Sequence, residues 1–132
     1  MGPRILVVDD NEVFRRPLQR ALEAAGLEVV AVSTAEAALD ALAGSTPDLL
    51  LTDQRLPGMD GVQLIARVKA THPAVAIIAM TAYGTSESAV EARRCGADDY
   101  LLKPFEVPDL LHAVHRVLDQ QKAPARGRAA SE

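Results

Sequence analysis

Short apolar runs alternate with amphipathic segments along most of the chain, and this alternation is what most restricts its fold. Five runs of strand length are rich in Val, Leu, Ile and Ala, and a segment with apolar residues at helical spacing follows each. The expected strands span 5–8, 28–32, 49–52, 75–80 and 100–102. The expected helices span about 12–25, 33–44, 62–70, 86–95 and 108–118. Repeated strand–helix units predict an α/β domain whose parallel sheet is covered by helices on both faces.

Local signals set some of the expected helix boundaries. Asp10 or Asn11 can cap the first helix. Pro17 lies past the first turn of that helix and removes one backbone hydrogen bond, so we expect a kink or a shortened helix there. The sequence Ser-Thr-Ala-Glu at 33–36 fits the capping-box pattern at the start of the second helix.

Polar residues stand where the expected strands end. Asp9 and Asp10 follow the first strand, Asp53 the third, Thr81 the fourth and Lys103 the fifth. The carboxyl ends of parallel strands share one edge of a sheet, where ligands bind in open α/β folds. Three carboxylates there repel one another unless a cation intervenes, and oxygen ligands favour a hard cation such as Mg²⁺. A metal, a lysine and a hydroxyl beside a carboxylate suit phosphoryl transfer to that carboxylate.

The segment after Asp53 ends the third strand abruptly. It reads Leu-Pro-Gly-Met-Asp-Gly over 56–61, and Pro and Gly mark loops. Asp53 is therefore expected at the carboxyl end of a strand, beside a loop and not beneath a helix.

Composition excludes several classes of protein. A chain of 132 residues corresponds to about one domain, and a net charge of −4 argues against general attraction to nucleic acid. Cys95 is the single cysteine, which excludes an internal disulfide and a multi-cysteine metal site. No apolar run approaches the roughly 18 residues of a membrane span. We expect a cytoplasmic domain that binds neither nucleic acid nor membrane directly.

Five pieces of sequence stand at the ends of the expected strands: Asp9-Asp10, Asp53 with the 56–61 loop, Thr81-Ala82, Tyr100, and Lys103-Pro104-Phe105. Taken together, they resemble the receiver domains of two-component response regulators. Each piece is weak alone, but their order and their matching strand ends make the set specific. The resemblance covers about residues 4–118 and implies a flavodoxin-like, doubly wound sheet in the order 2-1-3-4-5. Receivers of the nitrogen-regulator type are the most similar locally, over 80–84 and 96–100.

The resemblance implies a magnesium site beside a phosphorylated aspartate. Asp10 and Asp53 would bind Mg²⁺ directly, together with the main-chain carbonyl of Arg55. Asp9 would contribute mainly through water. The side chains of Arg55 and Tyr83 would flank the site and influence how water reaches the phosphoryl group, and thus its lifetime.

The resemblance also implies a switch. Asp53 would accept a phosphoryl group from a kinase histidine, and Lys103 would contact that group. Thr81 would move its hydroxyl onto a phosphoryl oxygen, and Tyr100 would turn inward behind it. The bond between Lys103 and Pro104 would be cis, which is accessible because proline follows.

The implied partners are proteins. A sensor histidine kinase or a phosphotransfer protein would supply the phosphoryl group. The fourth helix, fifth strand and fifth helix, about 86–95 and 100–118, would bind an output domain, a partner protein or, after phosphorylation, a second copy of the chain. We expect a receiver domain over 1–119, followed by a linker or disordered tail over 120–132, where apolar periodicity ends.

Three other classes of protein fit parts of the pattern. A flavodoxin-like cofactor binder needs a phosphate-cradling loop after the first strand, where Asp9, Asp10 and Asn11 stand instead. A phosphohydrolase with an aspartyl nucleophile is expected to carry that nucleophile on the first strand. An unphosphorylated interaction scaffold is disfavoured because the whole acceptor set is present. The leading hypothesis is an interaction module whose only chemistry is its own Mg²⁺-assisted phosphorylation and dephosphorylation.

Overall fold

The computed structural model describes residues 2–82 and 86–131 of the chain. They contain a five-stranded parallel sheet in the order β2-β1-β3-β4-β5, which confirms the predicted fold and strand order. The strands are β1 Arg4–Val8, β2 Glu28–Val32, β3 Leu49–Asp53, β4 Ala76–Thr81 and β5 Asp99–Leu102. The helices are α1 Glu12–Ala24, α2 Ala35–Gly44, α3 Gly61–Thr71, α4 Ser86–Cys95 and α5 Val107–Ser131.

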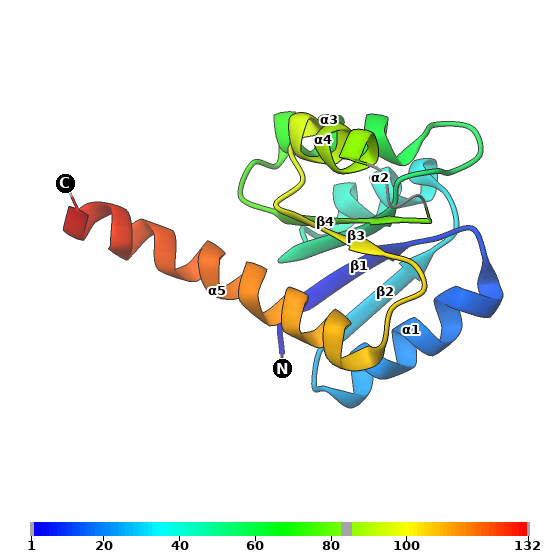
Figure 1. Cartoon of the computed structure of the whole chain (residues 1–132), viewed down its shortest axis with the longest axis horizontal. Coiled ribbons are helices and arrows are strands. Elements are labelled where there is room, and N and C mark those ends of the chain that lie inside the picture. Colours follow the sequence, from blue (N-terminus) through cyan, green and yellow to red (C-terminus); the bar gives the residue numbers. More distant parts are fainter. Residues whose placement is uncertain (1, 83–85, 132) are drawn as a thin grey trace.

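Helices cover both faces of the sheet, α1 and α5 on one side and α2, α3 and α4 on the other (Figure 1). Alternate side chains of each strand pack toward opposite layers, so Leu51 joins the core beneath α1 and α5 and Leu50 joins the core beneath the other three helices. The whole of β3 is buried, as expected for the middle strand of a parallel sheet covered on both faces. Asp53 is thus held at the end of a fully buried strand.

The register of the strands brings their polar ends together. Val8 of β1 pairs with Thr52 of β3, so the next residues, Asp9 and Asp53, lie beside each other. The last residues of β4 and β5 are also paired. The residues that follow these four strands therefore share the carboxyl edge of the sheet.

Helix α1 begins at an asparagine cap and contains a proline. The side chain of Asn11 accepts a hydrogen bond from the Val13 amide at 3.0 Å, as a good N-cap does. The helix continues through Pro17 to Ala24, so the expected shortening does not occur. Val13 and Pro17 are both exposed, and water can reach the Val13 carbonyl that the proline leaves without its helical donor.

Helix α2 begins differently from the capping box predicted over 33–36. Its N-cap is Thr34, whose hydroxyl accepts a hydrogen bond from the Ala37 amide at 3.0 Å. Glu36, expected to close the box, accepts instead from the Met59 amide at 3.3 Å. This carboxylate therefore ties α2 to the loop after β3, a contact between segments far apart in sequence.

The loop after β3 is held by a capping box at the start of α3. The Asp60 carboxylate accepts hydrogen bonds from the amides of Gly61 at 2.9 Å and Leu56 at 3.2 Å, and the Gln63 side chain accepts from the Asp60 amide at 3.1 Å. Gly58 adopts a φ of 72°, a left-handed conformation that glycine enters without steric cost. Local bonds thus fix the path of the chain next to Asp53.

Gly61 lies where the start of α3 passes very close to the end of β3. A Cβ atom on Gly61 would stand 1.8 Å from the carbonyl oxygen of Asp53. No side chain fits there unless the backbone that positions Asp53 moves.

We expect Gly61→Ala to lower the free energy of unfolding by about 3 kcal/mol, the upper end for forcing atoms into a packed site. Urea denaturation measures the change. Gly44→Ala is the matched control, because a Cβ there meets no atom within 4 Å, and we expect it to stay within about 0.5 kcal/mol of wild type. Equal stabilities of the two variants would contradict the prediction.

Helix α5 extends away from the sheet toward the C-terminus (Figure 1). Val117 and Leu118 are still buried against the core, and the helix continues to Ser131. The segment expected as a linker or disordered tail is thus helical as far as Ser131, and the domain boundary at residue 119 stays a prediction. Across residues 2–82 and 86–131, the helices lack the combination of length and apolar character needed to cross a membrane.

Candidate functional site

Three carboxylates gather at the carboxyl edge of the sheet. Asp9, Asp10 and Asp53 each offer an oxygen atom within 4.8 Å of the others. Asp9 is fully buried, Asp53 is 8% exposed and Asp10 is exposed. The structure therefore brings together the three acids that the sequence places after β1 and at the end of β3.

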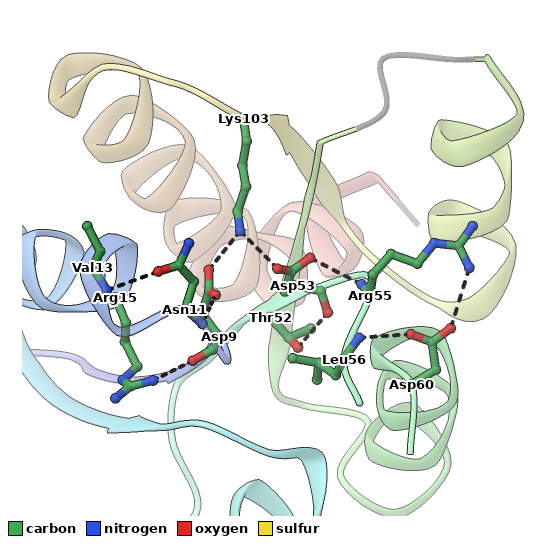
Figure 2. A network of polar contacts seen from close by, with 10 residues as sticks. All are labelled: Asp9, Asn11, Val13, Arg15, Thr52, Asp53, Arg55, Leu56, Asp60 and Lys103. Atoms are coloured by element: carbon green, nitrogen blue, oxygen red, sulfur yellow. Dashed lines mark hydrogen bonds and ion pairs between the residues drawn. The ribbon is translucent and has the colours of Figure 1, made fainter. Parts of the chain in front are cut away.

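Lys103 reaches into this cluster from the end of β5 (Figure 2). Its Nζ donates hydrogen bonds to Asp9 Oδ2 and Asp53 Oδ2, both at 2.8 Å. Burial alone would lower the pKa of Lys103, but these bonds to Asp53 and Asp9 outweigh it and raise the pKa above its ordinary value. Lys103 is thus a stable cation between two nearly buried carboxylates.

Each of these two carboxylates is held through both of its oxygens. While Oδ2 accepts from Lys103, Oδ1 of Asp9 accepts from the Asn11 amide at 2.9 Å, and Oδ1 of Asp53 accepts from the Arg55 amide at 3.1 Å. The Asp9 carbonyl also accepts from Arg15 Nη1 at 2.7 Å. Figure 2 shows this network. The acids are consequently fixed in orientation before any ligand binds.

Thr81 and Tyr100 lie on the side of the site formed by β4 and β5. Thr81 is buried, and its carbonyl accepts a hydrogen bond from the Lys103 amide at 2.7 Å. Tyr100 is half-buried, and the Arg93 guanidinium of α4 lies 5.8 Å from the centre of its ring. The peptide bond between Lys103 and Pro104 is cis, as the resemblance to receiver domains implies.

Arg55 and Tyr83 are the two residues expected to flank the site. The side chain of Arg55 is 61% exposed and extends to the Asp60 carboxylate at 3.8 Å, away from Asp53 (Figure 2). Tyr83 lies outside the residues that the structure describes. The expected influence of both residues on the phosphoryl group stays a prediction.

Two neighbours of the site were not predicted. The first is Asn11, whose amide donates to Asp9 Oδ1 in addition to its expected role as a helix cap. The second neighbour is Phe14 of α1, because the Lys103 Nζ lies 4.3 Å from the centre of its ring. Its position in the first turns of the helix that follows Asp9, Asp10 and Asn11 is the sequence signal that could have indicated it.

The donor set fits a hard divalent cation. Mg²⁺ prefers oxygen ligands, and this cluster offers carboxylate oxygens from Asp9, Asp10 and Asp53. It is the only cluster of three or more His, Cys, Asp or Glu side chains with such spacing in residues 2–82 and 86–131. The exposure of Asp10 gives an ion access from solvent.

Comparison with known proteins agrees with this arrangement. The sequence pattern of the family described as response regulator receiver domain matches residues 5–115. The response regulator protein FleR of Pseudomonas aeruginosa is 45% identical over 116 residues, covering 88% of this chain and 24% of FleR. The DNA-binding transcriptional regulator NtrC of Escherichia coli is 43% identical over 114 residues, covering 86% of this chain and 24% of NtrC. The chain thus spans about a quarter of the length of these relatives.

Solved structures show the same fold. A putative response regulator from Chloroflexus aurantiacus has a TM-score of 0.86 at 34% identity, covering 90% of this chain and 99% of that chain. A CheY-like response regulator receiver domain protein from Methanospirillum hungatei has a TM-score of 0.87 at 33% identity, covering 92% and 98%.

Three carboxylates lie at the carboxyl edge of the sheet, Lys103 is paired with two of them, and the strand order is β2-β1-β3-β4-β5. These features together define a receiver fold. The chain belongs to the response regulator receiver domain family of two-component signalling.

Proposed function

We propose that this chain is a phosphoacceptor whose phosphorylated residue is Asp53. The observation that carries the proposal is the single edge at which Asp53 meets two further carboxylates and a half-buried lysine cation. Asp53 supplies a carboxylate oxygen as the nucleophile, and a phosphohistidine of a sensor kinase or phosphotransfer protein supplies the phosphoryl group. The phosphorus–nitrogen bond breaks as the acyl phosphate forms.

The chain's own residues neutralise the incoming charge. Mg²⁺, when held by Asp9, Asp10, Asp53 and the Arg55 carbonyl, would neutralise phosphoryl oxygens. Lys103 turns its Nζ from Asp53 Oδ2 to a phosphoryl oxygen while its bond to Asp9 keeps it in place. Asp9 thus acts as an anchor for the lysine as well as a member of the acidic cluster.

The expected switch uses Thr81 and Tyr100. A phosphoryl group adds a charge of about −2 and strong acceptor oxygens, and the Thr81 hydroxyl donates to one of them. Moving a two-state equilibrium from about 1:99 to 99:1 takes roughly 5.5 kcal/mol. Hydrogen bonds to charged groups contribute about 1.5–3 kcal/mol each, so two or three new bonds suffice. Tyr100 follows by turning into the space that Thr81 leaves.

The proposed output surface consists of α4, β5 and α5. Asp99 of β5 forms ion pairs with Arg93 of α4 at 3.8 Å and with Arg116 of α5, so one carboxylate links both helices. A change at Tyr100, the next residue, reaches this surface directly. We expect phosphorylation to shift the backbone NMR signals of 86–95 and 100–118, and unchanged signals there would rule out this surface.

The proposed function is tested by incubating the chain with acetyl phosphate and Mg²⁺ and measuring its intact mass. We expect a gain of one phosphoryl group per chain. An unchanged mass would favour the alternative, an unphosphorylated receiver fold that serves as an interaction scaffold. We further propose that the domain turns over no external substrate and that its output passes to other segments or partner proteins.

Removal of Mg²⁺ gives a second, independent measurement. A ligand that binds only the folded chain stabilises it by about 2.7 kcal/mol at one hundred times its dissociation constant, so we expect Mg²⁺ to raise the melting temperature and EDTA to reverse the effect. Asp10→Asn is expected to weaken this stabilisation without lowering the metal-free melting temperature, because Asp10 is exposed and its loss removes one of three mutually repelling carboxylates. If Mg²⁺ raised the melting temperatures of Asp10→Asn and the wild type equally, Asp10 would not be a ligand of the ion.

A further inference from the structure

The Lys103 ammonium is enclosed by more than its two carboxylates. Its side chain is only 16% exposed, and its Nζ lies over the ring of Phe14, 4.3 Å from the centre. This distance is well within the roughly 6 Å over which a cation is attracted to an aromatic face. The ammonium is thus bound by Asp9 and Asp53 and also by an aromatic ring.

Phe14 is itself fixed by groups that belong to the site. Its ring packs edge-on against Phe105, with centres 5.5 Å apart and planes at 87°, and Phe105 follows Lys103 after a single intervening residue. The Phe14 amide donates to the Asn11 carbonyl at 3.2 Å, and the Asn11 amide donates to Asp9. The acid that binds Lys103 therefore also fixes the start of the helix that carries Phe14.

We propose that Phe14 is a positioning residue that holds the Lys103 ammonium at the acidic edge and so sets the rate at which Asp53 gains a phosphoryl group. The inference rests on the proposed phosphoacceptor function. When the phosphoryl group arrives, Nζ exchanges its bond to Asp53 for one to a phosphoryl oxygen. The ring keeps this movement short, whereas without the ring the lysine can turn out through its exposed side.

The test uses the full chain, acetyl phosphate and Mg²⁺. Phe14→Leu keeps an apolar side chain but removes the aromatic face, whereas Phe14→Tyr keeps the face. We expect Phe14→Leu to lower the phosphorylation rate at saturating acetyl phosphate about ten-fold, with little change in the half-saturating concentration. Phe14→Tyr is expected within about two-fold of wild type. Val13→Ala, one residue away and 84% exposed, is the control and should leave the rate unchanged.

The wild-type NMR spectrum gives a readout that does not depend on any variant folding. A ring face at this distance shifts the Lys103 Hε signals upfield, and we expect this shift to persist in Phe14→Tyr and to disappear in Phe14→Leu. A wild-type rate for Phe14→Leu, equally slow Tyr and Leu variants, or ordinary lysine Hε positions in the wild type would each overturn the proposal. A wild-type chain that gains no phosphoryl group would instead overturn the phosphoacceptor function itself.

Discussion

Asp53→Asn is expected to abolish phosphorylation by acetyl phosphate. The amide is close in size to the carboxylate, but its nitrogen and oxygen are poor nucleophiles. Asp9 does not replace Asp53 as the acceptor, because Asp9 is fully buried whereas Asp53 is 8% exposed. We expect no mass gain in Asp53→Asn under conditions that phosphorylate the wild type completely.

Asp40→Asn is the matched control for this experiment. Asp40 is an exposed carboxylate on α2, and its loss should leave the mass gain unchanged. Thermal unfolding of both variants verifies that they are folded. A full phosphoryl gain in Asp53→Asn would assign the acceptor to another residue and overturn the central proposal.

Lys103→Met is expected to cause the largest loss of stability among the changes considered. Methionine keeps an apolar stem of similar length but removes the cation, which leaves the carboxylates of Asp9 and Asp53 facing each other with side-chain exposures of 0% and 12%. Breaking a buried ion pair by removing one partner costs about 3–5 kcal/mol. Urea denaturation in EDTA measures the loss, and Mg²⁺ should recover part of it by supplying positive charge.

Lys69→Met is the control for this loss. The Lys69 Nζ lies 3.7 Å from Asp98, with side chains 33% and 30% exposed, and such pairs contribute about 1 kcal/mol or less. Similar losses for the two variants would show that the position of Lys103 between two acids gives it no special contribution.

The pH dependence of this contribution follows from the raised pKa of Lys103. A raised folded-state pKa stabilises the fold fully below the unfolded-state value, 10.5, and the stabilisation is lost as the pH rises through the folded-state value. On the alkaline side, the stability difference between wild type and Lys103→Met should therefore hold up to about pH 10.5 and decline above it.

Much of the fold could be predicted because buried positions of helices and strands are occupied by apolar residues at regular spacing in the sequence. The continuous apolar run of β3 is typical of a strand covered on both faces, and the apolar stripe of α1 is typical of a helix packed on a core. The capping box predicted at the start of α2 was wrong, because one of its residues forms its hydrogen bond to a different segment of the chain. Glu36 fits a capping box, yet its carboxylate accepts from Met59, because the register of distant elements placed an unbonded amide within its reach.

The sequence by itself determined which chemistry collects at one edge of the sheet. Acids follow β1 and end β3, and a lysine follows β5, so parallel pairing of those strands is enough to bring Asp9, Asp53 and Lys103 near one another. This inference needs only the strand direction, which the repeated strand–helix units indicate, and the strand order, which the resemblance to receiver domains implies.

Only the tertiary structure decided how those groups are held. That Lys103 binds one oxygen of each acid, that Phe14 covers the ammonium and that Gly61 must lack a side chain depend on register and on packing across layers. Sequence periodicity reports whether a residue is buried, whereas the partner of a buried polar group is chosen by three-dimensional geometry. The physical reason is that an unpaired charge in the interior is costly, so each group adopts the partner that packing brings within reach.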